Sequence, residues 1–200
     1  MGLILQYRHG QTPLDDDERD GLLVKGVDTK EQLDELEQHN IEEAIRWVMF
    51  RRKAITEQEV LTSEFIRLLH RKMFGNVWAW AGDFRKTNKN LGVDKYEIPM
   101  ALRNLLDDGQ FWISQHTFPP DELALRFKHR IVSIHCFANG NGRHSRLIAD
   151  IIAEKILSVP VFSWGARSAA DDESHRKAYL TAIRAADKGD YQPLIEFARN

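Results

Sequence analysis

Cysteine, net charge and long apolar runs are all scarce in this sequence. Among its 200 residues the only cysteine is Cys136, so no disulfide can form within the chain and a reducing compartment is expected. The net charge of −2 gives no argument for a nucleic-acid-binding or membrane-binding surface. No apolar stretch approaches the length that crosses a bilayer, and no signal peptide is visible after Met1. We therefore expect a cytoplasmic protein that binds neither nucleic acid nor membrane.

Apolar residues recur with a helical period along most of the chain. They make up 42% of the sequence, which is enough for one sizeable core. After a polar N-terminal stretch we expect a long helix to about residue 52. Within residues 75–96, where tryptophans and glycines break the helical period, we expect a β-hairpin or extended loop. The other expected helices span about residues 57–73, 98–116, 120–134, 140–157, 171–187 and 192–198. The predicted fold is mainly α with one β-hairpin. We expect two units: an N-terminal segment with the long helix, residues 1–55, and a main domain, residues 56–200.

One polar loop between two apolar helical runs carries the chemistry. It reads His135-Cys-Phe-Ala-Asn-Gly-Asn-Gly-Arg-His-Ser-Arg146, and its second half begins a helix. A helix N-terminus presents unpaired N–H groups and the positive end of a dipole, which together bind anions. Arg143 and Arg146 are three residues apart, so both can reach the same side of the first turn. The loop therefore predicts a phosphate site with a base, His135, beside it. Its candidate phosphate ligands are Gly140, Asn141, Gly142, Arg143 and Arg146.

The pattern His-x-Phe-x-x-Gly-Asn-Gly-Arg-x-x-Arg resembles the signature of the Fic (Fic/Doc) family of nucleotidyl transferases. The stretch Trp80-Ala-Gly-Asp-Phe-Arg85 is similar to the family segment that leads into a hairpin called the flap, and residues 185–195 resemble its C-terminal segment. The likeness covers about residues 60–198, and within the family it looks closest to the group labelled mobile mystery protein B. The resemblance implies a Fic-like helical bundle with one β-hairpin flap, and residues 56–200 as the Fic domain.

This resemblance implies a protein adenylyltransferase, which moves AMP from ATP to a Ser, Thr or Tyr hydroxyl of a target protein. His135 would be the general base, a role that suits histidine because its ordinary pKa lies near neutrality. Phe137 would be a structural plug in the core. The loop residues named above would hold the ATP phosphates. A target segment would pair with the flap at Lys89, Asn90, Leu91 and Gly92.

Two residues depart from the family pattern. Asn139 stands where the family has Asp or Glu, a carboxylate that holds Mg²⁺, and Cys136 replaces the usual proline. A neutral amide oxygen is a weaker ligand for Mg²⁺ than a carboxylate. Either the ATP phosphates hold most of the Mg²⁺ with weak help from Asn139, or the activity is low, or the substrate differs.

Regulation is also implied by the resemblance. Many relatives are switched off by a helix whose glutamate pairs with the second signature arginine. The nearest match here is Leu33-Asp-Glu-Leu-Glu37-Gln38, which makes Glu37 the candidate inhibitory residue. If Glu37 does not act in this way, a separate inhibitory partner protein is expected.

Three alternatives remain open from the sequence. A Fic-fold enzyme can transfer another phosphate-containing group, and a nucleotide-binding module can have lost its catalysis. The third is a metal hydrolase that uses His129, His135 and His144, whose spacings of six and nine lack the i, i+4 pair of a helical metal site.

Overall fold

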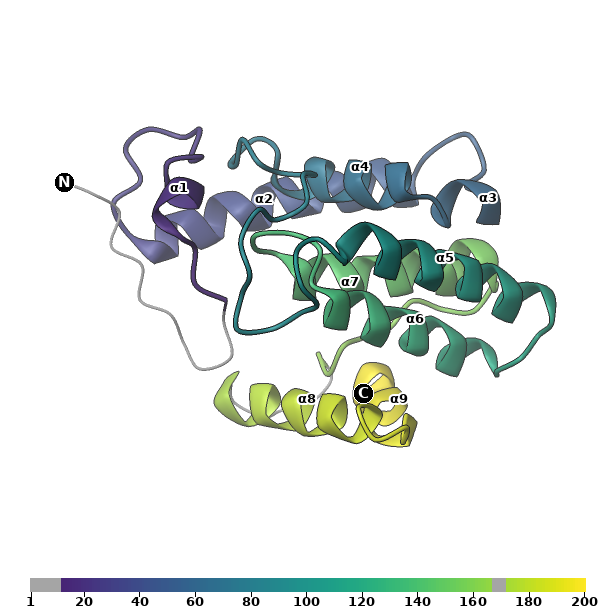
Figure 1. Ribbon diagram of the computed structural model, residues 1–200. Helices are drawn as coiled ribbons and strands as arrows, with labels where there is room; N and C mark the ends of the chain where they lie inside the picture. Colours follow the sequence, from purple (N-terminus) through teal and green to yellow (C-terminus); the bar gives the residue numbers. More distant parts are fainter. Residues whose placement is uncertain (1–11, 167–171) are drawn as a thin grey trace.

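The protein is an assembly of helices, and no β-sheet is present in the residues that the structure describes, 12–166 and 172–200 (Figure 1). This computed structural model confirms the predicted mainly α class. The elements are α1 (Asp16–Arg19), α2 (Lys30–Met49), α3 (Glu57–Val60), α4 (Ser63–Phe74), α5 (Ile98–Ser114), α6 (Pro120–Ile134), α7 (Asn141–Ile151), the π-helical turn η1 (Ile152–Ile156), α8 (Asp172–Ala186) and α9 (Gln192–Arg199).

Threonine side chains set where several helices begin. At the start of α2, the Thr29 hydroxyl accepts a hydrogen bond from the N–H of Gln32 at 3.3 Å. Thr62 caps α4 in the same way through the N–H of Phe65 at 3.1 Å. The single helix predicted over residues 57–73 is therefore wrong: Thr62 has an extended backbone and divides it into α3 and α4. Hydrophobic periodicity does not reveal a cap inside a periodic run.

Helix α7 is packed inside the bundle. Helix α2 lies along α4, α5 along α6, and α6 along α7, while α8 and α9 pair at the other side of the molecule (Figure 1). The side chains of Ile148 and Ile151 are fully buried. Leu157 donates its N–H to the carbonyl of Ile152 at 2.9 Å, so the last turn of the helix predicted to residue 157 is π-helical. Because α7 is anchored by the core, its N-terminal turn has a fixed position.

The first predicted unit shares this core. Helix α2 turns one apolar face toward α4, and its buried residues join the same hydrophobic cluster as the rest of the bundle. Those residues are Leu33, Ile41, Ala44 and Val48. The boundary at residue 55 stays a prediction.

The segment from Phe84 to Val93, which we call the flap segment, bonds to the signature loop. Arg85 donates its N–H to the carbonyl of Cys136 at 2.9 Å, and Val93 donates to the carbonyl of Ile134 at 3.3 Å. An isolated antiparallel bridge joins Phe84 to the same loop. The predicted hairpin is not confirmed, because the two ends of the flap segment pair with the loop instead of with each other.

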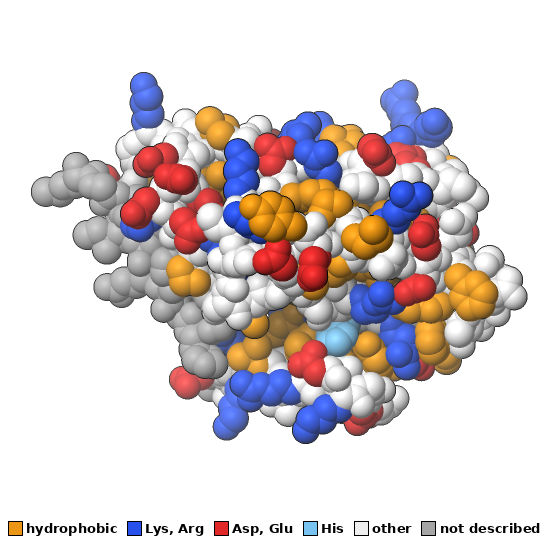
Figure 2. Space-filling view, in the orientation of Figure 1, with side chains coloured by type: hydrophobic (Ala, Val, Ile, Leu, Met, Phe, Trp, Pro, Cys, Tyr) orange, Lys and Arg blue, Asp and Glu red, His pale blue; other side chains and the backbone are white. Residues whose placement is uncertain are grey.

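Charged side chains of both signs are interspersed over the described part of the face in Figure 2, and acidic ones gather over α1. This mixture agrees with the net charge of −2. None of the helices in the described ranges combines the length and the apolar content that crossing a bilayer requires.

Two buried histidines lie under the signature loop. His70 of α4 accepts the N–H of Gly82 at Nδ1, at 3.0 Å, and its Nε2 lies 3.0 Å from the carbonyl oxygen of Asn139. The Nε2 of His144 lies 3.0 Å from the carbonyl oxygen of Ile66. Burial lowers the pKa of His144 to about 4 and the pKa of His70 well below its usual range. Both rings are therefore neutral structural pieces that join α4, α7 and the loop.

These histidines should make the fold sensitive to acid. An unfolded histidine binds a proton near its ordinary pKa of about 6.5, whereas folded His144 does so only near 4. Between these values the unfolded chain binds more protons, so the free energy of unfolding falls as pH falls through this window. Between about pH 7.5 and about pH 5 the loss from His144 alone is on the order of 2 kcal/mol. Urea unfolding at about pH 7.5 and about pH 5 measures it.

A matched pair of variants assigns this effect. His144→Gln keeps a donor for the Ile66 carbonyl and cannot titrate, so it should reduce the pH dependence and leave the part that comes from the other buried histidines. His39→Gln, at an exposed histidine of α2, should leave the dependence as in the parent protein. Equal free energies of unfolding at the two pH values in the parent protein would contradict the assignment.

Candidate active site

Helix α6 ends at His135 in a left-handed backbone conformation. Its φ is 57° and its ψ is 60°, and its N–H still bonds to the carbonyl of Ile131 at 3.3 Å. Histidine is one of the few residue types other than glycine that is enriched in this region. The carbonyl of His135 accepts the Nε–H of Arg85 at 2.7 Å. The imidazole is thus placed by α6 on one side and by Arg85 on the other.

The imidazole of His135 is neutral near pH 7. Burial and, next, the positive charge of Arg85 lower its pKa to about 4. The ring also bonds to the carbonyl of Val132, and its Nε2 lies 3.2 Å from Oγ1 of Thr12. A carbonyl only accepts, so we assign the ring proton to Nδ1 and the lone pair to Nε2. A base with this arrangement accepts a proton from an oxygen at Nε2.

Asn141 holds the signature loop in shape. Its amide oxygen accepts the N–H of Phe137 at 2.9 Å, and its amide nitrogen donates to the carbonyl of Phe137 at 2.7 Å. The amide that we expected to donate to a phosphate is therefore bonded inside the loop. What Asn141 offers a ligand is its backbone N–H in the first turn of α7.

The fold requires glycine at one of the two glycine positions of the loop and leaves the other open. Gly140 has a φ of 78°, and a Cβ there would lie 2.6 Å from the ring of Phe74, so the fold itself needs glycine. A Cβ at Gly142 would meet nothing within 4 Å. Packing therefore does not require glycine at position 142, and the space beside it is open. This open space adjoins the first turn of α7, where a helix attracts anions.

Asn139 offers little to a resident metal ion. Its amide oxygen accepts the N–H of Gly140 at 2.6 Å, and its amide nitrogen donates to the carbonyl of Thr12 at 3.1 Å. Within residues 12–166 and 172–200, no group of three His, Cys, Asp or Glu side chains is placed to hold a metal. Mg²⁺ in proteins takes carboxylates and substrate phosphates. This set of donors therefore does not fit a resident Mg²⁺, and the proposed role of Asn139 in metal binding stays untested.

Arg143 is held by Glu37 of α2. Its Nη1 lies 2.6 Å from Oε2 of Glu37, and its guanidinium lies over the ring of Phe74, 4.9 Å from the centroid. The other oxygen of Glu37 accepts the indole N–H of Trp78 at 2.6 Å. We expected Glu37 to pair with the second arginine, Arg146. The structure pairs it with the first, because Arg143 projects over α4, the neighbour of α2.

Arg146 points toward α8. Its guanidinium lies 4.7 Å from the ring centroid of Tyr179 and 5.7 Å from that of Trp164. Arg143 and Arg146, which we expected on one side, thus have separate partners. The Nε–H of Arg146 is buried and has no hydrogen-bond partner among the described residues. A buried donor without an acceptor is costly, and an anion bound there would remove that cost.

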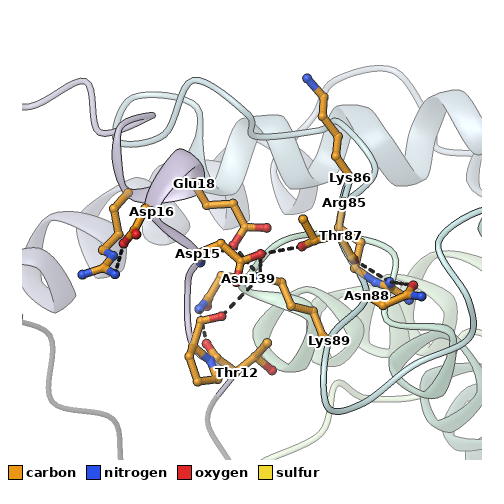
Figure 3. Close-up of polar contacts among 12 residues, drawn as sticks. Thr12, Asp15, Asp16, Glu18, Arg85, Lys86, Thr87, Asn88, Lys89 and Asn139 are labelled. Carbon is orange, nitrogen blue, oxygen red and sulfur yellow. Dashed lines mark hydrogen bonds and ion pairs between the residues drawn. The ribbon is translucent and has the colours of Figure 1, made fainter.

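The predicted target-binding residues of the flap segment differ in exposure. The ammonium of Lys89 is turned toward α1, where it lies 2.8 Å from Asp15 Oδ2 and 2.5 Å from Glu18 Oε2 (Figure 3). Its side chain is only 4% exposed. Asn90 and Leu91 are exposed. Lys89 is therefore part of an internal contact, whereas its two neighbours are free to meet another molecule.

Gly92 brings the flap segment against the base. Its φ is 103°, and a Cβ added there would lie 2.7 Å from the Cβ of His135. Only glycine allows this close approach. The flap segment and the base are consequently one packed unit.

The two residues that follow His135 in the sequence have structural roles. Burial raises the pKa of the Cys136 thiol to about 12, so this thiol is protonated and unreactive near neutral pH. Phe137 is fully buried beside His70, with ring centroids 3.8 Å apart, in the position of a core plug.

The three histidines of the metal hydrolase alternative have separate partners. His129 lies 2.8 Å from Asp187 Oδ1 and 3.1 Å from the Tyr191 hydroxyl. His144 faces the carbonyl of Ile66. These contacts leave His135 without the other two as co-ligands, so the structure argues against this alternative.

Two residues of the site were missed by sequence reasoning. Arg85 ends the stretch Trp80–Arg85 that resembles the family segment, and this motif was the signal that could have pointed to it. Thr12 lies 123 residues before the base and carries no motif, so no sequence signal pointed to it.

Comparison with known proteins identifies the family. Residues 60–153, which span α4 to α7 with the flap segment and the signature loop, match the model of the Fic/DOC family. These residues are a Fic domain, as the resemblance predicted. Nothing here distinguishes the mobile mystery protein B group within the family, and that assignment stays a prediction.

Relatives and solved structures agree with this family. "Protein adenylyltransferase Fic" of Aedes aegypti is 26% identical over 147 residues, which are 72% of this chain and 28% of that protein. The protein of the same name from Drosophila melanogaster is 28% identical over 141 residues, 68% of this chain and 27% of that protein. The chain thus spans less than a third of the length of these relatives. The structure of BepC from Bartonella tribocorum with bound AMPPNP has the same fold, with a TM-score of 0.66, 18% identity and coverage of 92% of this chain and 97% of that one.

Glu37→Gln should release Arg143. The amide keeps an oxygen for the indole N–H of Trp78, so the buried pair survives while the charge opposite Arg143 is removed. We expect tighter ATP binding, by roughly tenfold for about 1.4 kcal/mol, because the guanidinium becomes available to phosphate. Isothermal titration calorimetry with ATP measures the change.

The matched control is Glu35→Gln on the exposed side of α2, which should leave ATP binding unchanged. Equal dissociation constants for Glu37→Gln and the parent protein would show that the Glu37–Arg143 pair does not compete with ATP.

Proposed function

We propose that this protein transfers AMP from ATP to a hydroxyl side chain of a protein. The observation that carries the proposal is a neutral, buried imidazole whose Nε2 faces a hydroxyl, beside the N-terminus of α7. The Fic domain and the relatives named protein adenylyltransferase support it.

His135 is the general base of the proposed reaction. It takes the proton from the attacking hydroxyl at Nε2, while the bond to the Val132 carbonyl fixes the tautomer. Its lowered pKa keeps the base unprotonated through the physiological range. The same shift makes it a weak base, so we expect the rate to depend on positioning more than on basicity.

The phosphates of ATP bind at the start of α7 in this proposal. The backbone N–H groups of Asn141, Gly142 and Arg143 face the α- and β-phosphates, at the open space beside Gly142. Arg143 and Arg146 bind the outer phosphates and stabilise the departing pyrophosphate, since guanidinium groups form bidentate bonds to phosphate. The unpaired Nε–H of Arg146 supports this assignment. ATP enters as its Mg²⁺ complex, a substrate whose metal is held mainly by phosphate oxygens.

Recognition of the target and regulation complete the proposal. An extended target segment lies along the exposed Asn90 and Leu91 and bonds to the backbone near Gly92, in the manner of strand addition. Glu37 restrains Arg143 until ATP displaces it. A separate inhibitory partner protein and the cytoplasmic location stay predictions.

Transfer of another phosphate-containing group is the second candidate. The observation that favours it is Asn139, which leaves the family's metal position without a carboxylate. A module that only binds nucleotide is less well supported, because binding alone does not need a base at His135.

His135→Ala tests the proposed role of the base. The variant should bind ATP within a few-fold of the parent protein and lose transfer by roughly 10²-fold or more, the usual scale for a positioned base. Label from ATP carrying ³²P at the α-phosphate, followed on protein, measures transfer. His39→Ala, at an exposed histidine of α2, controls for loss of an imidazole. Transfer by His135→Ala at the parent rate would remove His135 from the mechanism.

Asn139→Asp tests whether the metal position limits the rate. A carboxylate binds Mg²⁺ better than an amide does, so the variant should need less Mg²⁺ for half-maximal transfer and should reach a higher rate. The carboxylate still accepts the N–H of Gly140, although it cannot donate to the carbonyl of Thr12. A Mg²⁺ titration of both proteins decides the matter. Superimposable curves would mean that residue 139 shapes the turn and does not bind the metal.

A further inference from the structure

Thr12 stands directly in front of the candidate base. Its Oγ1 lies 3.2 Å from Nε2 of His135, and the two residues are 8% and 6% exposed. The ring proton is assigned to the opposite nitrogen, so the threonine hydroxyl is the donor in this contact. A hydroxyl that donates its proton to a neutral imidazole has the arrangement of a nucleophile with its base.

Contacts on both sides of the site fix the backbone of Thr12. Its carbonyl accepts the amide N–H of Asn139 at 3.1 Å, and the next carbonyl, of Pro13, accepts from Lys89 Nζ at 3.4 Å (Figure 3). The side chain of Leu14 is buried in the hydrophobic core. The position of Thr12 is thus set by the signature loop, by the flap segment and by the core together.

The acidic residues that follow tie this stretch to the flap segment. Asp15 Oδ2 accepts the Thr87 hydroxyl at 2.6 Å, and Lys89 pairs with Asp15 and Glu18 (Figure 3). Because the Lys89 side chain is almost completely covered, these ion pairs are less screened than pairs on an open surface. Residues 12–18, which we call the arm, therefore lie on the flap segment at Thr87 and Lys89, next to the residues proposed to meet a target.

The arm also lies next to the proposed phosphate site. Asn139, which holds the carbonyl of Thr12, immediately precedes Gly140, the N-cap residue of α7. The backbone of Thr12 is thus tied to the loop that leads into the first turn of α7. The proposal places the nucleotide α-phosphate between that turn and the Thr12 hydroxyl.

We propose that Thr12 is a self-modification site, which receives AMP from ATP bound in the same chain. The proposal rests on the proposed function. The Thr12 oxygen forms a bond to the α-phosphorus of ATP, and the bond between that phosphorus and the oxygen bridging to the β-phosphorus breaks. Pyrophosphate leaves with that electron pair, and the hydroxyl proton passes to Nε2 of His135. The product is an AMP ester of Thr12.

The arm has a second consequence for other substrates. While Thr12 occupies the space at Nε2 of His135, no hydroxyl of another protein reaches the base. Thr12 is therefore the first acceptor, and modification of another protein requires the arm to leave the flap segment.

The test uses the full chain with MgCl₂ and ATP labelled at either the α- or the γ-phosphate. We expect α-label alone, mapped by tandem mass spectrometry to Thr12, with a rate constant that does not change when the protein is diluted about tenfold, since the step is intramolecular. Thr12→Ser should retain the label and Thr12→Ala should lose it. Thr181→Ala, at an exposed threonine of α8, is the matched control and should label as the parent does. His135→Ala should lower labelling by roughly 10²-fold.

The outcomes separate this proposal from the function on which it rests. Release of pyrophosphate with label on other residues, and undiminished labelling in Thr12→Ala, would overturn self-modification and leave AMP transfer standing. A rate that falls on dilution would mean transfer between copies and would also overturn it. Label from the γ-phosphate on Thr12 would replace AMP by phosphate and reject the proposal as stated. The absence of both label and pyrophosphate release, in the parent protein and in Glu37→Gln, would overturn the proposed function and this inference together.

Discussion

The buried guanidinium of Arg85 is the contact on which the candidate site depends. It donates to the carbonyls of His135 at 2.7 Å and Thr87 at 2.9 Å, and to that of Val93. Arg85 is only 4% exposed, so its charge is poorly solvated and burial lowers its pKa. A buried cation needs its donors satisfied, so the three carbonyls are bound to it and hence to one another. The left-handed turn that ends α6, the base and the flap segment thereby form one unit. Burial and, next, this positive charge keep the imidazole neutral.

The groups of the site restrain one another before any ligand is bound. Glu37 holds Arg143, and the arm covers His135. The side-chain amide of Asn141 is already hydrogen-bonded inside the loop. Within the described part of the chain, a nucleotide can use the backbone of the first turn of α7, the open space beside Gly142 and the Nε–H of Arg146, which has no partner there. Binding of ATP would thus compete with an ion pair that is already made, while modification of a separate protein would compete with Thr12. Both competitions lie within the chain.

Local patterns predicted the helices and the signature loop well, because both depend on residues close in sequence. The long helix α2 and the helix that follows the signature loop belong to this class. The break at Thr62 was not predicted, because hydrophobic periodicity does not reveal a helix cap inside an apolar run. The hairpin was predicted but is not confirmed, because the flap segment bonds to a loop some fifty residues away in sequence. Glu37 was found as a candidate but with the wrong arginine, because the choice depends on how α2 crosses α4. Thr12 depends on the whole fold, and no local pattern contains it.

A crystal structure of the full chain with a non-hydrolysable ATP analogue tests the central claim most directly. The account predicts α-phosphate oxygens within hydrogen-bond distance of the first N–H groups of α7, at about 2.7–3.2 Å, with the outer phosphates on Arg143 and Arg146. It also predicts Thr12 Oγ1 next to the α-phosphorus, on the side opposite the leaving pyrophosphate. An analogue bound elsewhere, or bound here with its α-phosphorus turned away from both His135 and Thr12, would contradict the account.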